Sequence, residues 1–207
     1  MSVLNFYKNR LLIVDLEATC WEKDKRNTTE METIEIGALK VDLNDMNKIE
    51  EFDKFIRPVR NPKLSEFCTK LTSIRQEDVD KAEIFPVVFP KFLEWVGDLE
   101  SISFCSWGNY DKWQFQKDCT YHKIKYPFGD NHFDIKALFT KTQNGKRYGV
   151  GGALRLLGMK FKGTRHRGID DTRNIWRIFK RMIQAGEDQM RLELLGELIG
   201  RTTSSRQ

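Results

Sequence analysis

The sequence has few of the features that mark secreted, membrane-spanning and zinc-binding proteins. Its 207 residues include four cysteines, which are widely spaced and form no Cys-x-x-Cys pair. Neither a zinc knuckle nor a disulfide framework is indicated, and we expect four reduced thiols. The apolar run at residues 11–14 is short and is followed directly by acids, so it predicts neither a signal peptide nor a membrane span. We therefore expect a cytoplasmic protein, or a nuclear one in a eukaryote, with no membrane partner.

Acidic residues are missing from one long segment, residues 135–169, which carries nine cations. The whole chain has a net charge of +5, which suits a polyanionic partner but is also common in ordinary enzymes. A basic segment of this kind could bring a phosphate backbone to a nearby site, and the alternative is a solvated basic surface. The cations are Lys136, Lys141, Lys146, Arg147, Arg155, Lys160, Lys162, Arg165 and Arg167.

The remaining composition, 40% hydrophobic and 31% charged, is that of a globular protein with one sizeable core. Apolar alternation predicts strands at 11–18, 33–43, 48–58 and 101–107, with a short fifth at 126–133. Helical spacing predicts short turns at 61–82 and helices at 85–99, 109–119, 133–142, 150–158 and 170–185, with Asn109 as a capping residue and Gly186 as a stop signal. We expect an α/β fold with one domain at 1–185, and a tail helix with a frayed end at 186–207.

Two acids interrupt the first predicted strand. Side chains two residues apart on a strand share a face, so Asp15 and Glu17 point the same way while Val14 and Leu16 point the other. Two neighbouring carboxylates repel each other and lose hydration when they are buried, and a bound divalent cation removes both costs. Mg²⁺ prefers such oxygen ligands. The alternative is an exposed pair on an edge strand.

Asp111 follows the fourth predicted strand and is the second candidate ligand. An acid in the first turn of a helix is also favoured by the helix dipole, so this position has an ordinary structural explanation.

The third candidate region is TRHRGIDDTRNIWRIF, which begins at Thr164. Asp171 lies four residues before Ile175 and so joins the inward stripe of the predicted helix, whereas Asp170 lines up with Asn174 on what we expect to be a solvated face. His166 shares a site with Asp171 only if it lies in the loop before the helix. An exposed loop histidine without a function is the alternative.

A two-metal phosphoryl-transfer site needs four carboxylates and one histidine. These residues can meet in one site only if the first and fourth strands are neighbours. Two ions roughly 3.5 to 4 Å apart clamp the scissile phosphate, and a histidine with a pKa near 6.5 is a suitable base for the attacking water.

This pattern resembles the DEDDh exonucleases of the DnaQ-like, ribonuclease H-like superfamily, over residues 10 to about 185. The segments DLEATCW, IEIGAL, LTSIRQEDV, WGNYDKWQF and HRGIDDTRNI look most like the Eri-1 subgroup, which includes the histone mRNA 3′-end exonuclease. The resemblance implies a five-stranded mixed sheet flanked by helices. The matching residues, in chain order, are Asp15, Glu17, Asp111, His166 and Asp171.

The resemblance also implies a 3′ to 5′ exonuclease that uses two Mg²⁺ ions, with Mn²⁺ as a possible substitute. It would release nucleoside 5′-monophosphates from single-stranded ends, with RNA favoured over DNA. Glu17 and the backbone of Ala18 would contact the terminal sugar. A DNA or short-oligonucleotide exonuclease and a non-catalytic nucleic-acid-binding protein are the rivals, and the sequence does not decide between a monomer and a homodimer.

Three further residues flank the motifs. Trp21 and Trp107 either stack on a base or pack in the core, and packing is the commoner use of an aromatic residue. Cys20, just beyond the acids, either touches the terminal nucleotide or only closes the core.

Overall fold

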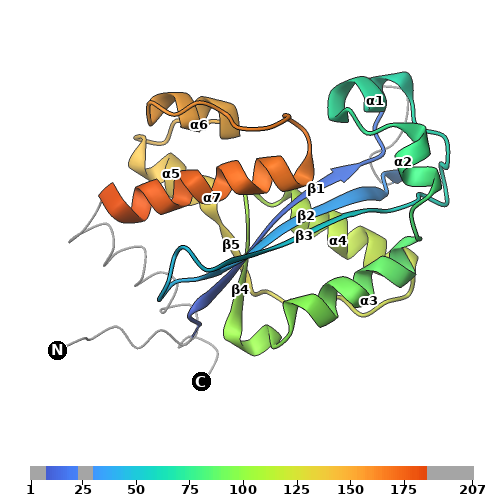
Figure 1. Ribbon diagram of the computed structural model, residues 1–207, viewed down its shortest axis with the longest axis horizontal. Helices are drawn as coiled ribbons and strands as arrows, with labels where there is room; N and C mark the ends of the chain where they lie inside the picture. Colours follow the sequence, from blue (N-terminus) through green and yellow to red (C-terminus); the bar gives the residue numbers. More distant parts are fainter. Residues whose placement is uncertain (1–7, 23–29, 186–207) are drawn as a thin grey trace.

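The computed structural model describes residues 8–22 and 30–185, which form a five-stranded sheet between two layers of helices (Figure 1). The strands are β1 Arg10–Ala18, β2 Thr33–Asp42, β3 Ile49–Phe55, β4 Ile102–Ser106 and β5 His132–Asp134. The helices are α1 Glu66–Thr72, α2 Gln76–Asp80, α3 Phe85–Val96, α4 Tyr110–Tyr121, α5 Ile135–Thr142, α6 Val150–Leu156 and α7 Gly168–Ala185, with a 3₁₀ turn at Leu99–Ser101.

The sheet has the strand order β3-β2-β1-β4-β5 and mixes two directions. β1, β2 and β3 form an antiparallel meander, while β4 and β5 run parallel to β1. Ile13 of β1 lies opposite Cys105 of β4, so the first and fourth strands are neighbours, as the candidate site requires. The carboxyl ends of these two parallel strands meet at one edge, which is where α/β sheets usually bind ligands.

Helices cover both faces of the sheet, which explains why β1 reads as a continuous apolar run. Leu11 and Ile13 pack on the side of α5, α6 and α7, and Leu12 and Val14 pack on the side of α3 and α4 (Figure 1). Asp15 continues the first series and therefore faces α7, as the alternation predicts.

Two local expectations were wrong, and that for Asn109 held only in its position. The fifth strand spans three residues, because a turn closed by the Asn131 N–H on the Phe128 carbonyl occupies the preceding segment, with Gly129 at φ 54°. Asn109 stands at the N-terminus of α4, but its backbone is already helical and its side chain makes no capping hydrogen bond. α7 begins two residues earlier than expected, at Gly168.

The expected solvated face of α7 is partly covered, because the loop before the helix folds over it. Asn174 is fully buried, donates to the Lys162 carbonyl at 2.7 Å and accepts from the Lys162 N–H at 3.1 Å. Asp170 accepts a hydrogen bond from the Thr164 N–H at 2.8 Å and pairs with Arg173. Both residues therefore hold the loop that carries His166.

The tail predicted at 186–207, with its helix and the stop signal at Gly186, lies outside the described residues. In the described part of the chain, no helix combines the length and the apolar character needed to cross a membrane.

Candidate functional site

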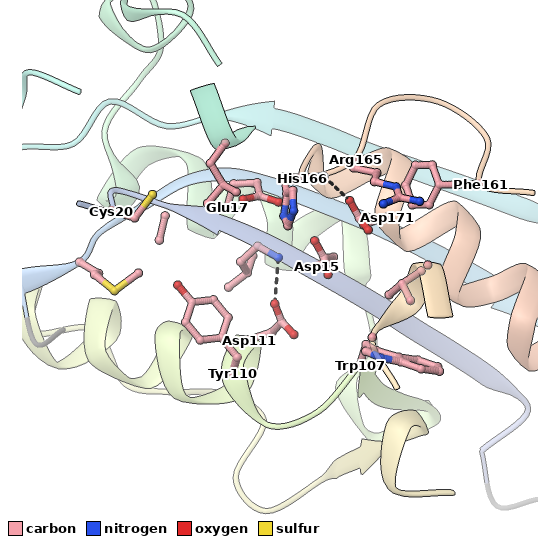
Figure 2. A pocket seen from close by; sticks show the side chains of 17 residues that line it. Asp15, Glu17, Cys20, Trp107, Tyr110, Asp111, Phe161, Arg165, His166 and Asp171 are labelled. Atoms are coloured by element: carbon pink, nitrogen blue, oxygen red, sulfur yellow. Dashed lines mark hydrogen bonds between the residues drawn. The ribbon is translucent and has the colours of Figure 1, made fainter. Parts of the chain in front are cut away.

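A pocket of about 480 Å³ opens at the carboxyl end of β1 and contains all five residues of the predicted site. β1 contributes Asp15 and Glu17, the start of α4 contributes Asp111, and the loop before α7 and its first turn contribute His166 and Asp171. Figure 2 shows these side chains gathered around the strand. Segments that are far apart in the sequence are therefore brought to one place.

Three of the acids form a tight group. Asp15, Glu17 and Asp171 each offer a carboxylate oxygen, and these oxygens lie within 4.8 Å of one another. Glu17 is only 9% exposed, whereas Asp15 and Asp171 are half-buried at the pocket. An all-oxygen donor set of this kind fits a hard divalent cation such as Mg²⁺ or Mn²⁺.

Burial and mutual repulsion make the charged form of this group costly. Burial, reinforced by the neighbouring carboxylates, raises the pKa of Asp15 well above its usual range and raises the pKa of Glu17 to about 9. Burial also raises the pKa of Asp171, against the opposing effect of the His166 N–H. A bound cation would favour the ionised carboxylates and so offset these costs.

Asp111 lies outside this group of three. Its Oδ1 accepts a hydrogen bond from the Leu16 backbone N–H at 2.9 Å, and the residue is only 4% exposed. Burial raises its pKa to about 7, against the lowering effect of the Leu16 N–H. Figure 2 shows Asp111 across β1 from Asp171.

His166 lies in the loop before α7, as the spacing requires, and its ring is exposed at the pocket. Its backbone is left-handed, with φ 59°, a conformation that non-glycine residues adopt only when neighbours hold it. A hydrogen bond of 2.7 Å from the His166 N–H to Asp171 Oδ2 stabilises this backbone conformation. The candidate base and a candidate ligand are therefore fixed to each other.

The same loop is tied to β2 through a buried acid. Glu35 is fully buried and accepts hydrogen bonds from the Arg167 guanidinium, at 3.1 to 3.2 Å, and from the Gly168 N–H at 3.0 Å. Glu35 therefore offsets the charge of Arg167, and the cations of the basic segment that could meet a nucleic acid do not include Arg167.

The residues that flank the motifs were expected either to contact the nucleotide or to pack in the core, and the structure places them differently. Trp107 lines the pocket, but its indole N–H donates to the Tyr148 carbonyl at 3.1 Å and its ring packs on Phe139. Cys20 and Ala18 line the pocket, and Cys20 also packs on the cluster around Cys68. Trp21 is half-buried and is not part of the pocket wall. The described cysteines are all free, as expected.

Sequence reasoning missed several residues of the wall. Tyr110, 40% exposed, precedes Asp111 directly and could have been found from its place in the motif. Met31 comes from a segment with no signal of its own, whereas Leu71 begins LTSIRQEDV, a segment that carries the family resemblance but gave no site residue. Both residues form an apolar end of the pocket near Cys20. Phe161 and Arg165 stand at the other end (Figure 2).

Comparison with known proteins agrees with this geometry. A family model described as Exonuclease matches residues 12–179. The chain belongs to this exonuclease family. Within it, the solved nuclease domain of 3′hExo, a DEDDh family member bound to rAMP, is 31% identical with a TM-score of 0.79, over 87% of this chain and 94% of that one. The exonuclease domain thus has the ribonuclease H-like DEDDh fold.

Two curated relatives have similar sequences. The 3′-5′ exonuclease eri1 of Schizosaccharomyces pombe is 35% identical over 83% of this chain, and the 3′-5′ exoribonuclease 1 of Rattus norvegicus is 32% identical over 89%. This chain spans 67% and 56% of the lengths of those proteins.

Proposed function

We propose that this exonuclease-family chain is a metal-dependent 3′ to 5′ exonuclease that releases nucleoside 5′-monophosphates from single-stranded RNA 3′ ends. The observation that carries the proposal is the group of three carboxylates, with oxygens within 4.8 Å of one another, in the same pocket as His166. The names of the two relatives, 3′-5′ exonuclease and 3′-5′ exoribonuclease, support the polarity and the substrate.

Asp15, Glu17 and Asp171 would hold one divalent cation, and Asp15 with Asp111 would hold a second. The ions, when bound, supply Lewis-acid stabilisation of the scissile phosphate and activation of a water. Asp171 fixes the backbone of His166, so the imidazole stands at the pocket, where it would accept the proton of the attacking water. Mg²⁺ is our first choice and Mn²⁺ the substitute.

The apolar end of the pocket suits the terminal nucleoside. Ala18, Cys20, Met31 and Leu71 provide the apolar wall, and Tyr110 provides a half-exposed ring on which a base can stack. Glu17, one of the three carboxylates, and Ala18, part of the apolar wall, are adjacent at the end of β1, and we propose that the terminal sugar rests against them. We propose RNA because the 3′hExo neighbour was solved with rAMP, and a DNA or short-oligonucleotide substrate is the alternative.

Product analysis tests this function. RNA and DNA oligonucleotides of the same sequence, labelled at the 5′ or the 3′ end, are incubated with the protein and Mg²⁺, Mn²⁺ or EDTA. We expect 3′-labelled RNA to release labelled 5′-monophosphate at once, 5′-labelled RNA to shorten stepwise, and EDTA to stop both. Faster trimming of DNA would select the alternative substrate. Tight RNA binding without monophosphate release would select a non-catalytic binding protein.

A further inference from the structure

Arg165 is the only Lys or Arg in the pocket wall, as far as the described residues go. It directly precedes His166, and Figure 2 places it beside Phe161, at the opposite end of the pocket from Cys20 and with the carboxylates in between. Its guanidinium carbon lies 5.6 Å from the centre of the Phe161 ring. The pocket thus has an apolar end and a cationic end.

The guanidinium of Arg165 is not engaged by acids, in contrast to its neighbours. Arg167 pairs with Glu35, and Arg173 pairs with Glu51 and Asp170. Within residues 8–22 and 30–185, the Arg165 side chain has the ring contact with Phe161 but no ion pair or hydrogen bond. Its N–H donors therefore remain available to a ligand.

Gly151 makes room for this guanidinium. A Cβ atom at Gly151 would lie 3.3 Å from Arg165 Nη2 and 3.4 Å from its Cζ, so an alanine would shift the guanidinium by a few tenths of an ångström and a branched side chain would displace it further. The guanidinium therefore lies between the α6 backbone and the Phe161 ring. Neither contact is a hydrogen bond, so the N–H groups of the guanidinium stay available to a planar or bidentate partner such as a phosphate.

We propose that Arg165 binds the substrate phosphate one step upstream, on the 5′ side, of the scissile phosphate. This proposal rests on the proposed function. The scissile phosphate must lie at the carboxylates, and the apolar end fits the terminal nucleoside, which carries no phosphate on its 3′ side. The rest of the chain must then leave past the opposite end, where the next phosphate meets Arg165.

Two dinucleotides test the proposal, because they differ by one phosphate. NpN contains only the scissile phosphate, whereas pNpN carries a 5′-phosphate at the upstream position. We expect wild-type kcat/KM to be about 10- to 100-fold higher for pNpN, the range for a charge-assisted hydrogen bond. Arg165→Ala should remove most of this preference, and Arg165→Lys should restore part of it.

Two further variants separate charge from structure. Gly151→Val keeps the charge but displaces the guanidinium, so it should reduce the preference for pNpN. Arg155→Ala removes a cation from an exposed position of α6 outside the pocket wall and should keep the preference intact.

The results that would overturn the role of Arg165 differ from those that would overturn the proposed function. A wild-type protein without preference, an Arg165→Ala variant that keeps it, or an equal loss on NpN and pNpN would each overturn the role of Arg165. A wild-type protein that cleaves neither dinucleotide nor longer RNA overturns the proposed function and this proposal with it.

Discussion

The backbone of Gly37 in β2 lies directly against that of Gly168, the first residue of α7. A Cβ atom on Gly37 would lie 2.0 Å from the Gly168 carbonyl carbon, and one on Gly168 would lie 2.7 Å from the Asp15 carbonyl oxygen. Thr172 reinforces the contact by donating from its hydroxyl to the Gly37 carbonyl at 3.0 Å. The absence of two side chains therefore lets the first turn of α7 rest on β1 and β2, which brings Asp171 to Asp15.

Gly37→Ala should damage both stability and activity. The added methyl group meets backbone rather than a flexible side chain, so α7 must move away from the sheet. We expect a loss of about 1 to 3 kcal/mol in the free energy of unfolding, and a loss of about 100-fold in kcat/KM if the site opens by an ångström. Urea unfolding and trimming of labelled RNA measure the two effects. Gly149→Ala is the control for unfolding, because its Cβ would have no atom within 4 Å. Wild-type stability in Gly37→Ala would contradict the close contact between the Gly37 and Gly168 backbones.

Much of this arrangement could be predicted from the sequence because its signals are local. The alternation of β1 fixes the face of Asp15 and Glu17, and helical spacing separates Asp171 from Asp170. These are properties of a single strand or helix, and tertiary packing did not override them.

The remaining features depend on residues far apart in the sequence. The hydrogen bond from the Leu16 N–H to Asp111 and the ion pair of Glu35 with Arg167 join residues that are 95 and 132 positions apart. The burial of Asn174 depends on how the incoming loop folds over α7. Neither spacing nor composition contains this information, so the expectation of a solvated face at Asp170 failed.

Asp171→Asn and Asp170→Asn form a matched pair of variants on adjacent residues. Asp171→Asn removes one charge from the group of three, and we expect a loss of about 10³-fold or more in kcat, since metal stabilisation of the phosphate is worth several kcal/mol. Asp170→Asn keeps an oxygen for the Thr164 N–H and loses only a half-exposed ion pair with Arg173, so activity should stay within about tenfold. Steady-state kinetics measure kcat for the two variants, and circular dichroism checks that both are folded. Equal losses of kcat would contradict the assignment of Asp171 to the metal site.

His166→Asn should slow catalysis without weakening metal binding. Asparagine tolerates the left-handed backbone at this position and keeps the N–H that Asp171 accepts, so the loop should hold its shape. Loss of a general base costs about 10²- to 10⁴-fold. Single-turnover rates report the chemistry, and calorimetric titration with Mn²⁺ reports metal affinity. A parallel fall in both quantities would assign His166 to the metal site instead of the proton transfer.

The stability of the metal-free protein should fall as pH rises. Burial and like charges raise the pKa of Asp111 to about 7 and that of Glu17 to about 9, so the folded chain binds protons more tightly than the unfolded chain. Their contribution is fully present below the unfolded values, near pH 4, and is lost as pH rises through 7 and 9.

Thermal unfolding in EDTA between pH 5 and 9 measures this dependence. Glu17→Gln removes one of the raised groups and should flatten the fall in Tm, most clearly above pH 7. Mg²⁺ should raise Tm more at pH 8 than at pH 6, because it binds the ionised carboxylates and competes with protons at the lower pH. A metal-free Tm that climbs across this range, or a Glu17→Gln variant with the wild-type slope, would show that these carboxylates are not held together in the folded protein, and the cation site inferred from them would have to be abandoned.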